Sequence, residues 1–185
     1  MFGKIWMKLV FTLLLIIFFT SVNATLQQDT VVVKEGKQSG ILLKKGDKMP
    51  DYVFKDFSGK RVSLKSFRGK YVYIDLWATW CISCIEQAPY FEELEEKFHN
   101  KKIVFVSISV DRHQEVWKRF VKAEKKRVLQ WVCPEGDKAP ILKDLGILTI
   151  PRFILLDKKG RILESNFGMP VWPQTEKILS GLDGI

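Results

Sequence analysis

An apolar run that leads directly into two closely spaced cysteines constrains the fold of this chain more than any other feature. Tyr71 to Trp77 has the length and composition of a buried β-strand. Residues 82–99 follow with apolar side chains at intervals of three and four, the spacing of an amphipathic helix. Cys81 and Cys84 therefore lie at the junction where the strand ends and the helix begins.

The position of this cysteine pair predicts its chemistry. Two cysteines three residues apart at a helix start can close a small disulfide ring. We expect Cys81 to point beyond the helix end, where free backbone N–H groups and the helix dipole stabilise a thiolate. A thiolate attacks a partner disulfide and forms a mixed disulfide, which the covered Cys84 then resolves. The pair therefore predicts reversible thiol–disulfide exchange.

A structural metal site and an inert structural disulfide are the two other interpretations of the pair. A structural zinc ion needs four ligands, but His99, His113 and Cys133 offer no matching ligand pairing. An inert disulfide would be unusual at a strand-to-helix turn. We expect no metal and no small-molecule cofactor, only the redox-active pair of Cys81 and Cys84.

The rest of the chain alternates short apolar runs with helical patterns, which predicts an α/β fold. Alternation favours parallel strands joined by helical crossovers, with a terminal hairpin as an antiparallel edge. Turn signals at Ser58-Gly59 and at residues 157–160 indicate two hairpins. The other expected strands cover residues 52–57, 61–64, 103–110, 128–132, 153–156 and 161–164, and the other expected helices cover residues 114–126, 139–145 and 173–182.

The first 24 residues have the pattern of an export signal. Lys4 and Lys8 precede an almost purely apolar run from Leu9 to Phe19, and Val22-Asn23-Ala24 places small residues at a cleavage position. The run is short for a membrane span, which needs about 20 residues. We therefore expect a cleaved signal peptide and a periplasmic protein, with an uncleaved membrane anchor as the alternative.

These patterns divide the chain into a signal peptide (1–24), a linker or small N-terminal extension (25–45) and one domain (46–185). The net charge is +9, and removing the signal, with its two lysines and no acid, leaves +7. Basic residues are mixed with glutamates over residues 92–102 and 118–127, as on a solvated surface. We therefore expect no nucleic-acid partner.

The cysteine motif and its surroundings resemble a known family. Residues 77–84 look like the W-C-x-x-C active-site motif of thioredoxin, and the wider pattern is similar to the exported TlpA/ResA-like thioredoxins. This resemblance covers roughly residues 46–182 and implies a thioredoxin fold, a central mixed sheet flanked by helices, with an N-terminal β-hairpin extension. The segments that carry it are Gly46–Pro50, Ser58–Leu64, Gly69–Cys81, Ser109–Asp111 and Gly146–Pro151.

The resemblance implies roles for individual residues. Cys81 matches the attacking thiol and Cys84 the resolving thiol. Asp75 matches the buried acid of thioredoxin, whose pKa desolvation should raise, suiting it to accept the Cys84 proton. Pro151 matches the family's cis-proline, which would turn the Ile150 backbone toward a bound partner. The alternatives are a polar residue at a frayed strand end for Asp75 and an ordinary trans-proline.

Two departures from the family pattern change what the resemblance implies. The family usually carries Glu three residues after the second cysteine, but here that place is Gln87, with Glu86 beside it. Because Gln cannot exchange a proton, we expect Asp75 to carry this role alone. Ile82-Ser83 between the cysteines carries no charge, which predicts that the protein is not an extreme oxidant.

Three further side chains near this motif have two interpretations each. Trp77 and Trp80 are expected either to form an apolar contact surface near the disulfide or to pack in the core, and core packing suits Trp77 better. We take Trp80 as a partner-binding residue. Cys133 is expected to be buried, the usual state of a free cysteine, with a role as a third redox thiol as the alternative.

The sequence therefore favours an enzyme, a thiol–disulfide oxidoreductase that reduces exported proteins, with cytochrome c maturation as one setting. Its expected partners are protein dithiols or disulfides and a membrane or periplasmic electron donor. A peroxiredoxin-like peroxidase would carry Thr or Ser three residues before the reactive cysteine and Pro seven before. Those places hold Ala78 and Ile74. A non-catalytic thioredoxin-like binding module is the third interpretation.

Overall fold

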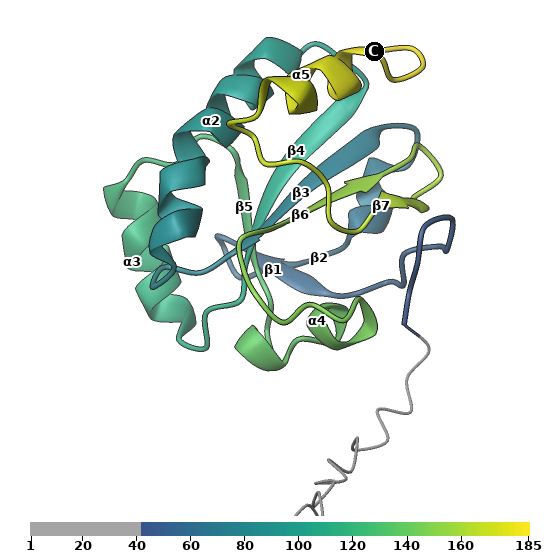
Figure 1. Cartoon of the computed structure of the whole chain (residues 1–185). Coiled ribbons are helices and arrows are strands. Elements are labelled where there is room, and N and C mark those ends of the chain that lie inside the picture. Colours follow the sequence, from purple (N-terminus) through teal and green to yellow (C-terminus); the bar gives the residue numbers. More distant parts are fainter. Residues whose placement is uncertain (1–41) are drawn as a thin grey trace, which may run out of the picture. The chain divides into compact units, whose positions relative to one another are not determined.

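A mixed β-sheet with strand order β2-β1-β5-β4-β3-β6-β7 forms the centre of the domain (Figure 1). The computed structural model describes residues 42–185, so the predicted signal peptide and most of the predicted linker lie outside the described residues. The strands are β1 (Phe54–Asp56), β2 (Arg61–Val62), β3 (Tyr71–Trp77), β4 (Ile103–Ser109), β5 (Leu129–Val132), β6 (Arg152–Leu156) and β7 (Ile162–Glu164).

Four α-helices and two short 3-10 helices accompany the sheet in the described residues. Each predicted strand and helix is present, with ends that differ by at most three residues, whereas the 3-10 helices were not predicted. Among residues 42–185, no helix is both long and apolar enough to cross a membrane. The helices are η1 (Leu64–Phe67), α2 (Ile82–Phe98), α3 (Gln114–Ala123), η2 (Gly136–Lys138), α4 (Pro140–Asp144) and α5 (Pro173–Ser180).

The strand directions agree with the predicted topology. β3 pairs in parallel with β4, and β4 with β5, while β6 pairs antiparallel to β3 and to β7. The β1–β2 hairpin turns at Ser58-Gly59, where Gly59 adopts a φ of +89°, and it extends the sheet by pairing antiparallel to β5. The predicted thioredoxin fold with an N-terminal hairpin is therefore confirmed.

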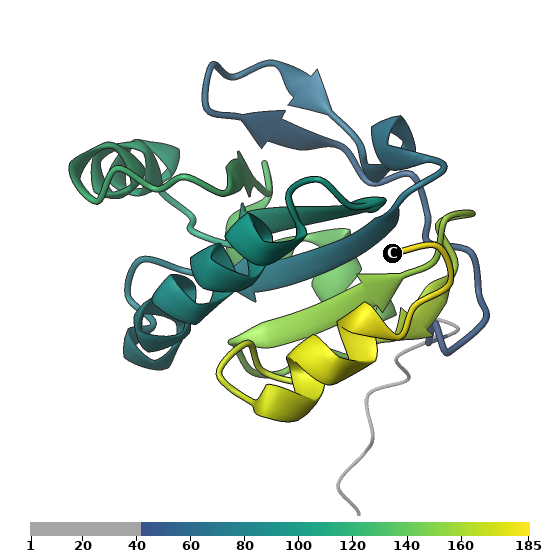
Figure 2. The ribbon, with the colours of Figure 1, turned by 90° about the horizontal axis from the view of Figure 1, so that it is seen from above.

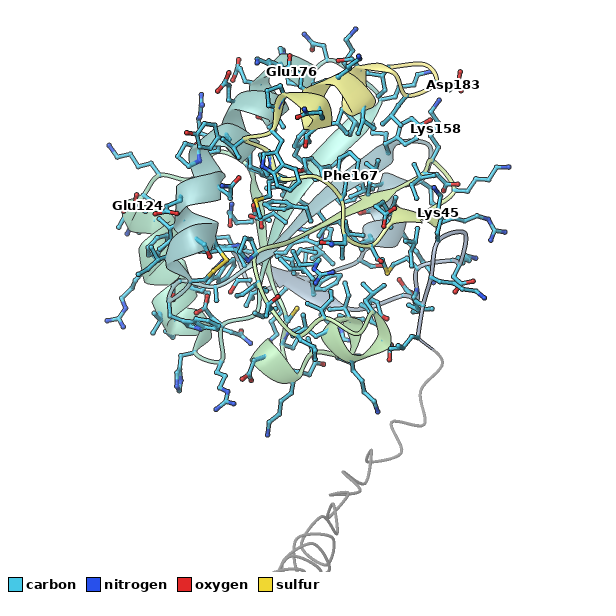
Figure 3. All side chains as sticks on the ribbon, in the orientation of Figure 1. Lys45, Glu124, Lys158, Phe167, Glu176 and Asp183 are labelled. Carbon is cyan, nitrogen blue, oxygen red and sulfur yellow. A yellow bond between two sulfur atoms is a disulfide. The ribbon has the colours of Figure 1, made fainter. Side chains whose placement is uncertain are left out.

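Side chains of β3 alternate between two apolar clusters because successive residues of a strand face opposite sides of the sheet. Tyr73 faces the side covered by α2 and α5, which lie next to each other in Figure 2. Its ring lies 5.0 Å from that of Phe91 on α2 and 5.3 Å from that of Phe167. Phe167, which follows β7, is labelled in Figure 3. Ile74 and Leu76 pack in the other cluster. The central strand is thus buried on both faces.

The beginning of the described chain is tied into the domain. The Leu43 N–H donates to the Asp144 carbonyl oxygen at 2.7 Å, and the Leu43 side chain packs on the core. Lys48 forms an isolated antiparallel bridge with Arg161. Leu43 falls in the segment that the sequence assigns to a linker or small extension, so this end of that segment belongs to the domain.

Candidate active site

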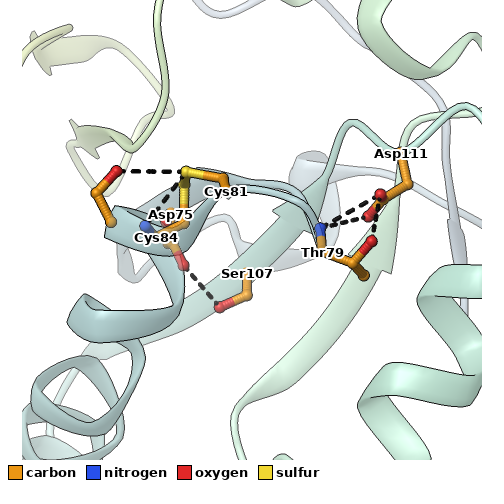
Figure 4. The surroundings of a disulfide bond; sticks show 7 residues. Asp75, Thr79, Cys81, Cys84, Ser107 and Asp111 are labelled. Atoms are coloured by element: carbon orange, nitrogen blue, oxygen red, sulfur yellow. Dashed lines mark hydrogen bonds between the residues drawn. A yellow bond between two sulfur atoms is a disulfide. The ribbon is translucent and has the colours of Figure 1, made fainter.

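Cys81 and Cys84 are joined by a disulfide at the start of α2, with their Cα atoms 5.2 Å apart (Figure 4). Cys81 is the N-cap residue, and its sulfur accepts a hydrogen bond from the Cys84 N–H at 3.2 Å. The Ser83 hydroxyl oxygen lies 3.5 Å from the same sulfur. These groups are placed to stabilise a thiolate on Cys81 once the disulfide is reduced.

Both cysteines are largely buried in the disulfide form. Cys81 retains 7% exposure and Cys84 2%, so the difference in accessibility is smaller than the sequence led us to expect. The exposed surface here comes from the residues next to Cys81. Trp80 is 66% exposed and Ile82 is also exposed, whereas Trp77 is buried in the core. The two tryptophans are thus divided between contact surface and core packing.

Hydrogen bonds from Thr79 and Ser109 to Asp111 hold the loop that joins β3 to Cys81, and we call this group of hydrogen bonds the clamp. The Thr79 N–H donates to both carboxylate oxygens of Asp111, at 3.0 and 3.2 Å, and the Thr79 hydroxyl donates at 2.8 Å (Figure 4). The Ser109 hydroxyl donates to the same carboxylate at 2.6 Å. Because β3 and β4 run parallel, the residues that follow them meet at one edge of the sheet, and the clamp fixes the loop there.

The sequence did not assign a role to Asp111. Ser109-Val110-Asp111 was noticed only as part of the family pattern. The signal that would have found the clamp is the position of Thr79 and Asp111, which follow the predicted strands 71–77 and 103–110 by two residues and by one residue. Polar side chains at the carboxyl ends of adjacent parallel strands come close together, and a buried carboxylate needs donors.

Asp75 lies on β3 beneath α2 and is 4% exposed. Its Oδ2 accepts a hydrogen bond from the Ser107 hydroxyl at 3.3 Å (Figure 4). Burial raises the pKa of the Asp75 carboxyl to about 7, against a smaller lowering by the Ser107 hydrogen bond and the Lys126 charge. A group with this pKa exchanges protons readily near neutral pH. The predicted desolvation of this side chain agrees with the structure.

A narrow cavity of about 10 Å³ brings Asp75 and Cys84 together. Both side chains line it, so the buried carboxyl lies next to the resolving cysteine. Gln130, Glu92 and Lys126 line the same cavity. The Asp75 carboxyl and the Cys84 side chain are therefore neighbours in one cavity that also holds charged side chains.

Gln87, at the place of the family's usual Glu, does not line this cavity, and its Oε1 is buried without a hydrogen-bond partner among the described residues. Glu86 is exposed and does not line the cavity either. The structure therefore places neither residue where it would exchange a proton with Asp75. A carboxylate that does line the cavity, Glu92, was not singled out from the sequence.

Ile150 and Pro151 lie beside the disulfide loop, and the peptide bond between them is cis. The antiparallel register pairs Leu76 with Arg152, so the residues just before Arg152 lie opposite the end of β3. Leu148, in the same loop, is among the most exposed apolar side chains of residues 42–185. Trp80 and Ile82, the sequence neighbours of Cys81, are exposed as well.

Cys133 is buried and unpaired in the described part of the chain. Burial raises the pKa of its thiol to about 12. The thiol is therefore protonated near neutral pH and unreactive, as expected for a buried free cysteine. Residues 42–185 contain no cluster of three or more His, Cys, Asp or Glu side chains that could hold a metal ion.

Comparison with known proteins identifies the family. Residues 44–180 match the model of the Redoxin family. The chain belongs to the Redoxin family. It is 30% identical over 167 residues to the thiol-disulfide oxidoreductase ResA of Bacillus thuringiensis subsp. konkukian, a match that covers 90% of this chain and 91% of the relative. It is also 30% identical over 152 residues to the thioredoxin-like protein YneN of Bacillus subtilis, covering 77% and 82% of the two chains.

Solved structures agree with this assignment. A putative thiol-disulfide oxidoreductase from Bacteroides vulgatus superposes with a TM-score of 0.69 at 35% identity, covering 75% of this chain and 96% of that one. A putative thiol:disulfide interchange protein DsbE from Chlorobium tepidum gives a TM-score of 0.63 at 28% identity, covering 75% and 94%. The predicted TlpA/ResA-type family is confirmed, and the chain is a thioredoxin-like thiol–disulfide oxidoreductase.

Proposed function

We propose that the protein reduces disulfides of exported proteins, with Cys81 as the attacking thiol, Cys84 as the resolving thiol and Asp75 as the acceptor of the Cys84 proton. The observation that carries this proposal is the shared cavity of Asp75 and Cys84 beneath a disulfide at a helix N-terminus. The pKa of about 7 at Asp75 supports the assignment, because proton exchange at neutral pH is fastest for such a group.

The reaction begins with the reduced dithiol. The Cys81 thiolate attacks one sulfur of a partner disulfide, and the other partner sulfur leaves as a thiolate and takes up a proton. Cys84 then gives its proton to the Asp75 carboxylate, and the Cys84 thiolate attacks the Cys81 sulfur. This step forms the disulfide of Cys81 and Cys84 and releases the second partner thiol. Two electrons have passed to the partner.

A dithiol donor of the membrane or periplasm must return these two electrons for the next turnover. The apolar surface of Trp80, Ile82 and Leu148 and the backbone at Ile150-Pro151 provide the contact region for partner chains. Aromatic and large aliphatic side chains exposed around a reactive centre are typical of protein-binding surfaces. We therefore propose protein chains as the partners.

The export pattern of residues 1–24 supports a periplasmic location. In that compartment unprotected thiols become oxidised, so proteins that need free thiols depend on a reductase. Apocytochromes c are one such class, because haem attaches to the two thiols of a C-x-x-C-H motif. We include cytochrome c maturation as a setting for this activity.

Reduction of insulin disulfides by the purified mature chain tests the proposal, together with the reduction potential of the Cys81–Cys84 pair. We expect turnover that Cys81→Ser abolishes, and a mixed disulfide that accumulates with Cys84→Ser. A potential well below that of the glutathione pool without any exchange activity would contradict the proposal. Rapid turnover of hydrogen peroxide would instead favour a peroxidase, although Ala78 and Ile74 occupy the positions of its usual Thr or Ser and Pro.

A further inference from the structure

The cavity beneath Cys84 contains three buried polar atoms that lack a protein partner in the described part of the chain. They are Asp75 Oδ1, Trp77 Nε1 and Gln130 Oε1, and each belongs to a side chain that lines this cavity. The three residues are at least nine-tenths buried. Unpaired buried polar atoms are costly and rare, so three around one cavity indicate a missing common partner.

The chemistry of the three atoms fits one water molecule. A volume of about 10 Å³ is close to the minimum that a water needs. The water would accept a hydrogen bond from the indole N–H of Trp77 and donate to the oxygens of Asp75 and Gln130. Three hydrogen bonds are the usual number for a buried water. A water held here would touch the carboxyl that faces Cys84.

Glu92 and Lys126 are charged side chains of this cavity that also reach solvent. Both line the cavity, and their side chains are 20% and 12% exposed. The Glu92 carboxylate lies 3.9 Å from Lys126 Nζ and 3.8 Å from Arg127 Nε. Glu92 follows Cys84 by eight residues on α2, and residues four and eight apart share one helix face. The same face of α2 thus carries the resolving cysteine and a carboxylate that also lines the cavity.

We propose that Glu92, oriented by Lys126, passes protons between Asp75 and solvent through a water bound by Asp75, Trp77 and Gln130. This inference rests on the proposed function of Asp75 and extends it to the outside of the protein. Each oxidation of the Cys81–Cys84 pair leaves the proton of Cys84 on Asp75. Protonated Asp75 donates its O–H to the water, which frees one water hydrogen to point at the Glu92 carboxylate. The water takes the proton of Asp75 while it gives one of its own to Glu92, and Glu92 releases that proton to bulk solvent. The carboxylate absent at Gln87 is thereby supplied further along α2.

The charges around Asp75 determine how each substitution changes the pKa of its carboxyl. Lys126 favours the ionised form of Asp75, and its loss should raise the pKa of that carboxyl. Glu92 opposes ionisation by like charge, but it is partly exposed and paired with two cations. The polar and titratable groups that face Asp75 are Cys84 and Glu92 from α2, Ser107 from β4, Gln130 from β5, Lys126 from the segment before β5, and Tyr73 on β3.

The test compares Glu92→Gln and Lys126→Met with the wild type in the purified mature chain. The pH dependence of mixed-disulfide resolution is measured by stopped flow, the pKa of Asp75 by carboxyl NMR, and the reduction potential by equilibration with glutathione. We expect Glu92→Gln to slow resolution about tenfold at pH 7, less than the loss of a direct acid–base group because Glu92 acts through Asp75. Its reduction potential should not change, since a relay alters rate and not equilibrium. Lys126→Met should shift the pH profile of resolution to higher pH, because loss of this charge raises the pKa of Asp75.

Matched controls separate a relay from a general effect of charge. Glu96→Gln removes a carboxylate that also pairs with Arg127, at 3.6 Å, but does not line the cavity. Lys122→Met removes a lysine of α3 that is likewise outside it. Both controls should keep the wild-type profile, and Glu92→Asp should recover part of the rate. Unfolding temperatures of all variants identify any loss of structure.

Two results would overturn the inference. One is a wild-type pH profile and resolution rate in both Glu92→Gln and Lys126→Met. The other is the absence of NOEs between water and the Trp77 indole N–H, which would show that the cavity holds no water. Either result with normal insulin reduction by the wild type removes the relay and leaves the proposed function in place. Absence of insulin reduction by the wild type would instead remove the proposed function.

Discussion

Asp75 and Asp111 are both buried near the disulfide loop, but their carboxylates are satisfied to very different degrees. Asp111 accepts hydrogen bonds from the Thr79 N–H, the Thr79 hydroxyl and the Ser109 hydroxyl. Asp75 accepts one, from Ser107 at 3.3 Å, and its other oxygen has no protein partner in the described residues. A fully bonded carboxylate holds a loop in place, whereas an incompletely bonded one is free to gain and lose a proton.

Asp75→Asn should have the largest effect on the free energy of unfolding, because it removes the titrating carboxyl of this pair. The folded pKa of Asp75 is raised to about 7 from 3.8, so the folded state binds more protons than the unfolded state between these values. The free energy of unfolding of the wild type should therefore fall as the pH rises from about 4 to about 7. The upper limit of this loss is about 4 kcal/mol, at 1.36 kcal/mol per pKa unit.

Asn carries no titrating proton, so the variant should lack this dependence and gain in stability relative to the wild type across that pH range. Urea unfolding at several pH values measures the difference. A wild type and an Asp75→Asn variant with parallel pH dependence would mean that Asp75 does not titrate with a raised pKa.

Asp111→Ala should destabilise the protein by about 3 kcal/mol. The substitution leaves the donors of Thr79 and Ser109 buried without an acceptor, a loss typical of a broken buried network. Urea unfolding at pH 7 measures it, with Asp137→Ala as the control. Asp137 pairs with Arg112 on the surface, where an ion pair contributes at most about 1 kcal/mol. Equal effects at the two positions would mean that the clamp does not hold the loop.

Replacing each of two β4 serines with alanine compares the two carboxylates again, with smaller expected losses of stability. Ser109→Ala removes a 2.6 Å donor to Asp111 and an acceptor of the Asp111 N–H, so we expect a loss of about 1–2 kcal/mol. Ser107→Ala removes only the 3.3 Å bond to Asp75, and we expect about 0.5 kcal/mol or less. Ser107→Ala should also raise the pKa of Asp75, as carboxyl NMR would detect. A larger stability loss at Ser107 than at Ser109 would reverse the ranking of the two carboxylates.

The sequence predicted most of the fold because its strongest patterns are local. Tyr71–Trp77 was predicted with the observed ends, since a run of apolar residues between turn signals leaves little choice of structure. α3 ends at Ala123, three residues before the predicted end, because Lys125 adopts a φ of +49° that a helix does not allow.

The candidate site was only partly predictable, since its remaining parts depend on tertiary contacts. Asp75 was found because an acid inside an apolar strand stands out in sequence. Lys126 and Glu92 did not stand out, because each belongs to a charge-rich segment. The turn at Lys125 ends α3, and the segment that follows it brings Lys126 to Glu92, 34 residues away in the chain. A contact between residues so far apart in the chain leaves no periodic pattern in the sequence.

The burial of Cys133 has a consequence for disulfide formation under oxidising conditions. Three thiols can pair in three ways, and an oxidising compartment offers no protection against a wrong pairing. Burial raises the pKa of the Cys133 thiol to about 12, so the thiol stays protonated near pH 7, and the side chain has almost no exposed surface. Once folded, the domain thus shields its odd thiol from mispairing, and thiol chemistry is confined to the two cysteines of the exchange site.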